Sequence, residues 1–148
     1  MVIIMKDRNK LENILNLLLE KAFECSGNGE IPVAAAVVDH DFNVISVCGN
    51  DRQSTHNVLG HAEILAIQRA EEYIKDWRLD GYSMIVTLKP CEMCRAVIKE
   101  CRLDRVYYLA DRNNNEQLDN NIFVKLVDFE KYAVKSSDLL TSFFDNMR

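Results

Sequence analysis

The chain has 148 residues, which is the length of one compact domain and leaves no room for a second independent core, so we expect a single domain over 1–148. Hydrophobic residues make up 48% and charged residues 28% of the chain, which excludes disordered, collagen-like and coiled-coil classes. The net charge of −5 argues weakly against a non-specific nucleic-acid binder.

The N-terminal part of the sequence predicts a helix followed by a β-hairpin. Apolar residues spaced by three and four favour a helix over 7–25, which Gly27 and Gly29 end. Two apolar runs, 33–38 and 44–47, flank a polar turn and are typical of paired antiparallel strands.

The middle of the sequence predicts a helix, a strand and a further helix. A polar loop over 50–60 leads into residues 61–74, which are rich in helix formers. The short apolar run 84–88 is typical of a buried strand. Pro90 then stands where a helix over 91–101 is expected to begin, because proline suits the first helical turn.

The C-terminal part predicts a strand, a loop and a closing helix. The strand is expected over 105–109 and the asparagine-rich loop over 110–121. The helix is expected over 138–144, with Ser136 or Ser137 near its N-cap. Strands that alternate with helices predict an α/β sandwich around one mixed sheet.

Basic residues are unevenly distributed along the chain. Residues 31–87 carry four basic and eight acidic side chains, whereas residues 88–112 carry six basic and four acidic side chains. This basic segment favours either contacts with phosphate groups or simply solvated helix faces. Its members are Lys89, Arg95, Lys99, Arg102, Arg105 and Arg112.

The expected cellular location decides how the cysteines are interpreted. We expect a protein with no secretory signal and no membrane-spanning segment, located in the cytoplasm. Five cysteines in such a protein favour metal binding or catalysis over a disulfide framework. Cys91 and Cys94 are three residues apart at a predicted helix start and therefore project from one face. His61 stands at the start of the other predicted helix, and thiolates and imidazole are ligands that zinc prefers.

The number of ligands separates a catalytic from a structural zinc site. His61, Cys91 and Cys94 supply three, which leaves one position for water, and Glu63 is suited to carry protons beside it. A closed structural site would need a fourth ligand, and none of the remaining candidates forms a second spaced pair. Those candidates are Cys25, Cys48, Cys101 and His56.

His-x-Glu followed by Pro-Cys-x-x-Cys resembles the signature of zinc-dependent deaminases. More narrowly, the chain resembles the bacterial tRNA-specific adenosine deaminases over nearly its whole length. The matching motifs, in family order, are Glu30-Ile31-Pro32-Val33-Ala34-Ala35, Gly49-Asn50, His61-Ala62-Glu63-Ile64, Trp77-Arg78-Leu79, Val86-Thr87-Leu88-Lys89-Pro90-Cys91 and Leu140-Thr141-Ser142-Phe143-Phe144.

This resemblance implies a three-layer α/β/α sandwich around a mixed five-stranded sheet, the cytidine deaminase-like fold. It implies hydrolytic conversion of adenosine to inosine at the wobble position of a tRNA anticodon. It also implies one zinc ion per chain with a bound water or hydroxide, the tRNA anticodon stem-loop as partner, and a homodimer.

The resemblance also implies residue roles. His61, Cys91 and Cys94 hold the metal, and Glu63 is the general acid and base. Asn50 hydrogen-bonds the purine, the backbone of Ala62 assists it, and Val33 contacts the base. One of Phe143 and Phe144 closes the pocket, or both belong to the core.

The chain departs from the family pattern near the end of the basic segment. The family has a Gly-Ser in the loop over 111–117, and this sequence has none there. An alternative function is therefore a free-base or nucleoside deaminase acting on guanine, cytosine or cytidine. A second alternative is a non-catalytic zinc-bearing subunit, against which the presence of Glu63 argues. Further departures are Ala34, Gly60, Lys89 and Glu92.

Overall fold

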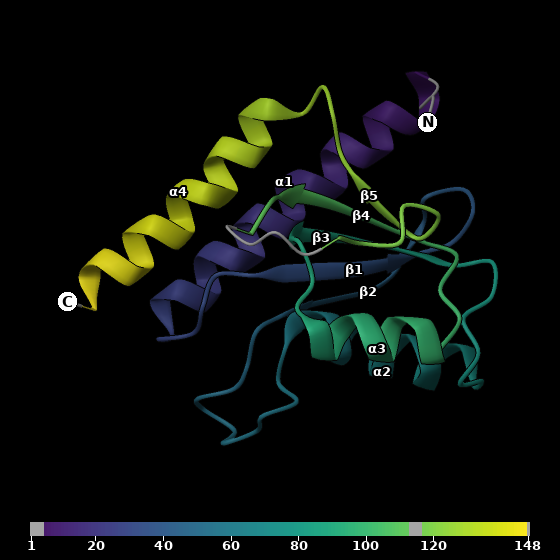
Figure 1. Cartoon of the computed structure of the whole chain (residues 1–148), viewed down its shortest axis with the longest axis horizontal. Coiled ribbons are helices and arrows are strands. Elements are labelled where there is room, and N and C mark those ends of the chain that lie inside the picture. Colours follow the sequence, from purple (N-terminus) through teal and green to yellow (C-terminus); the bar gives the residue numbers. More distant parts are fainter. Residues whose placement is uncertain (1–4, 113–116, 148) are drawn as a thin grey trace.

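The structure is a computed structural model that describes residues 5–112 and 117–147. These residues form four helices and five strands (Figure 1). In chain order the elements are α1 (Met5–Gly27), β1 (Ala34–Val38), β2 (Val44–Gly49), α2 (Ala62–Ile74), β3 (Ser83–Leu88), α3 (Glu92–Glu100), β4 (Arg105–Ala110), β5 (Phe123–Lys125) and α4 (Glu130–Asn146).

The strands form one mixed sheet in the order β2-β1-β3-β4-β5. β1 pairs antiparallel with both β2 and β3, while β3, β4 and β5 run parallel to one another. Because β3 and β4 are parallel, with Leu88 opposite Ala110, the segments that follow them leave the sheet at the same edge. This edge carries the functional side chains described below.

The helices cover both faces of the sheet. α1 and α4 lie against one face, and α2 and α3 lie against the other (Figure 1). The buried side chains of β1 alternate accordingly: Ala35 and Val37 belong to the core under α2 and α3, and Ala34 and Ala36 belong to the core under α1 and α4. Small residues in β1 let the helices approach this strand from both sides of the sheet. The three-layer sandwich with a five-stranded sheet is confirmed.

The first helix, the hairpin and the strands at β3 and β4 lie where the sequence predicts them. β5 has no counterpart among the predicted elements, because three residues are too few to show a period. The last helix begins at Glu130 rather than near 138, so the prediction of an N-cap at Ser136 or Ser137 is wrong; the N-cap is Phe129. Ser136 is instead 1% exposed, and its hydroxyl donates to the carbonyl oxygen of Thr87 at 3.0 Å.

One further boundary differs from the predictions, and part of one predicted loop is not described. α3 begins at Glu92 with Cys91 as its N-cap, so Pro90 precedes the helix. Residues 113–116 of the asparagine-rich loop lie outside the described residues. None of the described helices is both long and apolar enough to span a membrane.

Candidate active site

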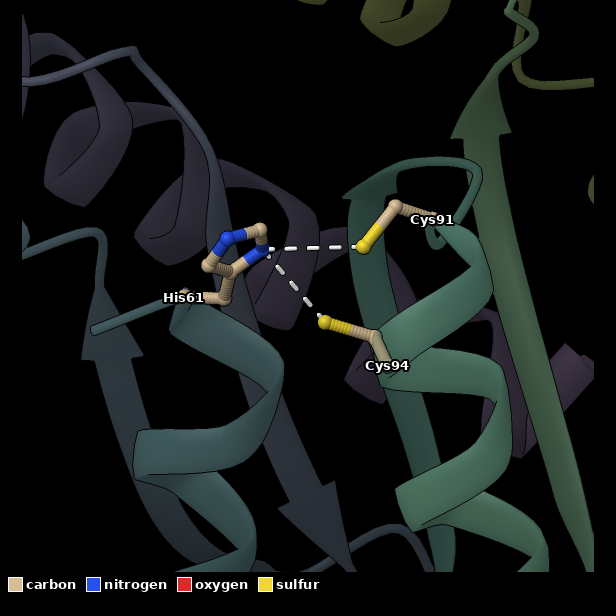
Figure 2. A group of neighbouring side chains, drawn as sticks. All are labelled: His61, Cys91 and Cys94. Atoms are coloured by element: carbon tan, nitrogen blue, oxygen red, sulfur yellow. Dashed lines mark hydrogen bonds between the residues drawn. The ribbon is translucent and has the colours of Figure 1, made fainter. Parts of the chain in front are cut away.

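The two predicted metal-binding motifs meet at the starts of α2 and α3. His61 is the N-cap residue of α2, and Cys91 is the N-cap residue of α3. Neither side chain caps its own helix, so both are directed into the space between the helices (Figure 2). The positive ends of two helix dipoles therefore face the sulfur atoms and stabilise negative charge there.

The side chains of His61, Cys91 and Cys94 converge (Figure 2). His61 Nδ1 lies 3.7 Å from Cys91 Sγ and 3.5 Å from Cys94 Sγ, and the three ligand atoms all lie within 4.8 Å of one another. A tetrahedral zinc ion with usual Zn–S and Zn–N bond lengths requires nitrogen–sulfur distances of about 3.6 Å. One zinc ion fits these three donors without rearrangement of the backbone.

The other metal-binding candidates lie apart from this group. Among the described residues, the cluster holds three donors and not four, which is the number found in catalytic rather than structural zinc sites. Cys25, Cys48 and Cys101 are buried free thiols elsewhere in the fold, and His56 lies in the exposed part of the loop over 50–60.

The two cysteine thiols of the cluster share a proton. A hydrogen bond with Cys94 lowers the pKa of Cys91 to about 4, with further help from the charges of His61 and Arg112. The same hydrogen bond, together with burial, raises the pKa of Cys94. Cys91 is therefore a thiolate at neutral pH, which is the form that binds a metal ion.

Glu63 is the buried carboxyl group of this site. It is the second residue of α2 and is 2% exposed. Burial raises the pKa of Glu63 to about 7, although its own backbone N–H and a hydrogen bond with Cys94 oppose the rise. A carboxyl group in contact with a metal-binding thiol is placed where it can exchange protons with a molecule bound at the cluster.

Asn50 connects the end of β2 to the start of α2. Its Oδ1 accepts a hydrogen bond from the backbone N–H of Ala62 at 2.7 Å, and its own backbone N–H donates to the carbonyl oxygen of Val33 at 3.1 Å. The first contact fixes the orientation of the carboxamide, so its NH₂ group points away from Ala62. Val33 is 5% exposed and belongs to the core under α2 and α3.

A cavity of about 410 Å³ lies beside Asn50 and is closed by the end of α4. Phe143 and Phe144 both line it, together with Ile31, and their rings meet edge to face with centroids 5.4 Å apart. The phenylalanine pair is therefore at a cavity wall that Asn50 shares, and Phe144 is 47% exposed.

Glu30 belongs to one of the sequence motifs, but the motif does not indicate what its side chain contacts. Its side chain is buried at 3% exposure and accepts three backbone hydrogen bonds from the loop between Asn50 and His61. The donors are Arg52 N–H at 3.0 Å, Gln53 N–H at 2.7 Å and Ser54 N–H at 3.1 Å. One carboxylate thus orders the loop that carries a candidate substrate residue at one end and a metal ligand at the other.

Replacing Glu30 with alanine is expected to lower the free energy of unfolding by about 3 kcal/mol, because three buried N–H donors lose a charged acceptor. We also expect KM to rise, since Asn50 and His61 lose the constraint on their loop. Urea unfolding and steady-state kinetics measure the two effects. Glu24→Ala, which removes an exposed acid that lies 3.7 Å from Lys21, is the matched control and is expected to stay near wild type. A Glu30→Ala variant that is as stable as Glu24→Ala would contradict the prediction.

Comparison with known proteins places this site in a class. Residues 8–110 match the family described as the cytidine and deoxycytidylate deaminase zinc-binding region. A mixed five-stranded sheet with a His, Cys, Cys cluster at two helix starts defines the same class, the zinc-dependent deaminases.

Full-length relatives narrow the class. The chain is 33% identical over 140 residues to a tRNA-specific adenosine deaminase of Rickettsia bellii, covering 88% of this chain and 97% of the relative. It is 30% identical over 145 residues to that of Aquifex aeolicus, covering 93% and 95%. The chain belongs to the zinc-dependent deaminase family and, within it, to the tRNA-specific adenosine deaminases.

Solved structures agree on the fold. A structure from a study of A-to-I editing by tRNA:A34 deaminases at the wobble position matches with a TM-score of 0.75 and 27% identity, over 87% of this chain and 99% of that one. A guanine deaminase from Nitrosomonas europaea matches with a TM-score of 0.71 at 17% identity, over 87% of this chain and 81% of that one. The second match supports the fold alone.

Proposed function

We propose that this protein converts adenosine to inosine at the wobble position of a tRNA anticodon by hydrolytic deamination. The observation that carries the proposal is the position of Glu63, a buried carboxyl group in contact with Cys94 of a cluster that fits zinc. The substrate is supported by the relatives that share at least 30% identity over almost the full chain and are named for this activity.

The reaction divides between the metal and the side chains. When bound by His61, Cys91 and Cys94, zinc supplies a Lewis acid that activates water for attack on the amine-bearing carbon of the base. Glu63 takes the proton that this water loses and delivers it to the ring nitrogen. It then takes a second proton, from the new hydroxyl group on the base, and passes it to the amino group, which leaves as ammonia. Its burial keeps bulk water from competing for these transfers.

Asn50, Ala62 and Val33 hold the base. Because the N–H of Ala62 is engaged by Asn50 Oδ1, we assign the direct hydrogen bond to the NH₂ group of Asn50 and a positioning role to Ala62. Val33 supplies apolar contact beneath the base, and the Phe143–Phe144 pair closes the cavity beside it. An anticodon base must leave its stack to enter such a site, as is usual for enzymes of this chemistry.

We further propose that the enzyme works as a homodimer through the face formed by α2 and α3. Two exposed apolar side chains, Leu59 at 45% and Trp77 at 54%, line a cavity of about 370 Å³ there together with Val97. Sedimentation equilibrium is expected to give twice the mass of one chain. The double variant Leu59→Glu, Trp77→Glu is expected to sediment as a monomer, and a wild-type protein with the mass of one chain would contradict the proposal.

The proposal also includes the domain organisation and the cellular location of the protein. The chain acts as one deaminase domain, since both hydrophobic cores lie against a single sheet. It acts in the cytoplasm, where its tRNA substrate is found.

The function is tested by parallel incubation of zinc-loaded protein with an anticodon stem-loop and with a panel of free bases and nucleosides. The panel contains guanine, cytosine, cytidine and adenosine, and products are identified by mass spectrometry. We expect inosine in the stem-loop alone. Product from the panel alone would replace the proposal with the small-molecule alternative, and no product from either would favour the non-catalytic alternative.

A further inference from the structure

Arg112 lies at the edge of the sheet that carries the cluster. It follows β4 by two residues, and β4 runs parallel to β3, which leads to Pro90 and Cys91. The backbone N–H of Lys89 donates to the carbonyl oxygen of Ala110 at 2.9 Å, so the two segments leave the sheet side by side. The side chain of Arg112 therefore starts next to the segment that enters α3.

A hydrogen bond from one of its nitrogen atoms holds the guanidinium of Arg112 in place. Its Nε donates to the carbonyl oxygen of Lys89 at 2.6 Å, which fixes the head group two residues before Cys91. Among the described residues, its two terminal NH₂ groups have no hydrogen-bond partner and the side chain makes no ion pair. Two groups of the guanidinium fork thus remain available to a ligand.

The nearby acid does not neutralise this charge. Asp111 is shared between two lysines, since its Oδ1 lies 3.4 Å from Lys89 Nζ and its Oδ2 lies 3.9 Å from Lys125 Nζ. Arg112 itself is half-buried, so solvent screens its charge only in part.

The head group of Arg112 lies at the start of α3. Its Nε is bonded to the carbonyl oxygen of Lys89, and Cys91, the N-cap residue of α3 and one of the three donors of the cluster, is two positions further along the chain. The guanidinium therefore stands close to the place where the base would be deaminated.

We propose that Arg112 binds a phosphate of the RNA backbone next to the deaminated nucleotide. The inference rests on the proposed function. Adenine and ribose are uncharged, so the phosphate is the anion that such a substrate brings to this edge. The planar guanidinium fork matches phosphate oxygens. Because the chain carries a net charge of −5, it has little general attraction for RNA, and a cation fixed at the site has a correspondingly large effect.

The test compares Arg112→Gln and Arg112→Lys with a matched control at the opposite end of the same strand. Arg105 begins β4 and is exposed, so Arg105→Gln removes the same charge far from the site. Binding of an anticodon stem-loop is measured by fluorescence anisotropy over a range of salt concentrations, in zinc-loaded protein with the Glu63→Ala change. Kinetics with Glu63 intact give KM and kcat.

We expect Arg112→Gln to raise Kd and KM about tenfold, as for the loss of a charged hydrogen bond, with kcat nearly unchanged. The slope of log K against log salt should fall by about 0.7, which corresponds to one phosphate contact on a single strand. Arg112→Lys should keep the slope, and Arg105→Gln should match wild type.

Other results would overturn the inference. Equal Kd and salt slope for Arg112→Gln and Arg105→Gln would leave Arg112 only as a structural contact of Lys89. A fall in kcat with unchanged Kd would mean that Arg112 acts on Glu63 and not on phosphate. Wild-type protein that neither binds nor deaminates the stem-loop would refute the proposed function and this inference together. If the wild type deaminates the stem-loop and Arg112→Gln leaves Kd, KM and the salt slope unchanged, this inference alone would be refuted.

Discussion

The Glu63→Ala variant is expected to deaminate its substrate about a thousandfold more slowly than wild type, because it loses the group that carries the proton from water to the base. The loss should lie in kcat, since the carboxyl group acts on the reacting atoms. Its zinc content, measured by inductively coupled plasma mass spectrometry, should stay at one ion per chain, because Glu63 is not among the three donors.

The control for this variant is Glu92→Ala. Glu92 is also an acid in the first turn of a helix at this site, but its side chain is exposed. We expect its activity to remain within about twofold of wild type, as is usual for exposed positions. A Glu63→Ala variant that keeps zinc and wild-type kcat would remove Glu63 from the mechanism and revive the non-catalytic alternative.

The second large effect is expected for Cys94→Ala. Cys94 is fully buried and lies 3.5 Å from His61 Nδ1, so its removal leaves two donors where zinc sites need at least three from the protein. Zinc content should fall to background after dialysis, and activity should fall with it. The melting temperature should also fall, because metal binding stabilises the folded state by mass action.

The matched control for Cys94→Ala is Cys101→Ala. Cys101 is a buried thiol at the other end of α3 and is not among the donors of the cluster. It should keep its zinc and its activity, with at most a small loss of stability from the shorter side chain. Zinc retained by Cys94→Ala, or lost equally by both variants, would contradict the assignment of the metal site.

The metal cluster was predictable because its information is local in the sequence. The spacing of Cys91 and Cys94 and the two helix starts can be recognised without tertiary structure. Only the proximity of the two motifs in space depends on the sheet. The same holds for the helix over 7–25, whose apolar period is strong, and for the hairpin.

The contacts that hold the site together were not predictable in this way. The hydrogen bonds of Glu30 reach a loop more than twenty residues away. The hydrophobic periodicity of the sequence does not predict such long-range contacts. Ser136 looks like a helix cap in the sequence because serine favours that position. The structure uses it inside α4, where its hydroxyl satisfies the carbonyl oxygen of Thr87.

The role of Ala62 shows the same limit at the level of single atoms. The backbone of Ala62 was expected to help bind the base, and in the structure its N–H donates to Asn50 Oδ1, a contact that the sequence does not indicate. Which partner a backbone donor takes depends on how β2 ends beside α2, and this is a property of the packed fold. The position of Arg112 at the sheet edge depends in the same way on the parallel pairing of β3 and β4.

We expect this chain to deaminate the wobble adenosine of an anticodon. Two stem-loops that differ only in the position of their single loop adenosine, one at the wobble position and one at its neighbour, are incubated with zinc-loaded protein. Nucleoside mass spectrometry then measures inosine. We expect inosine from the first stem-loop, none from the second, and none from either with Glu63→Ala. Equal inosine from both stem-loops, or none from the first, would refute deamination at the wobble position.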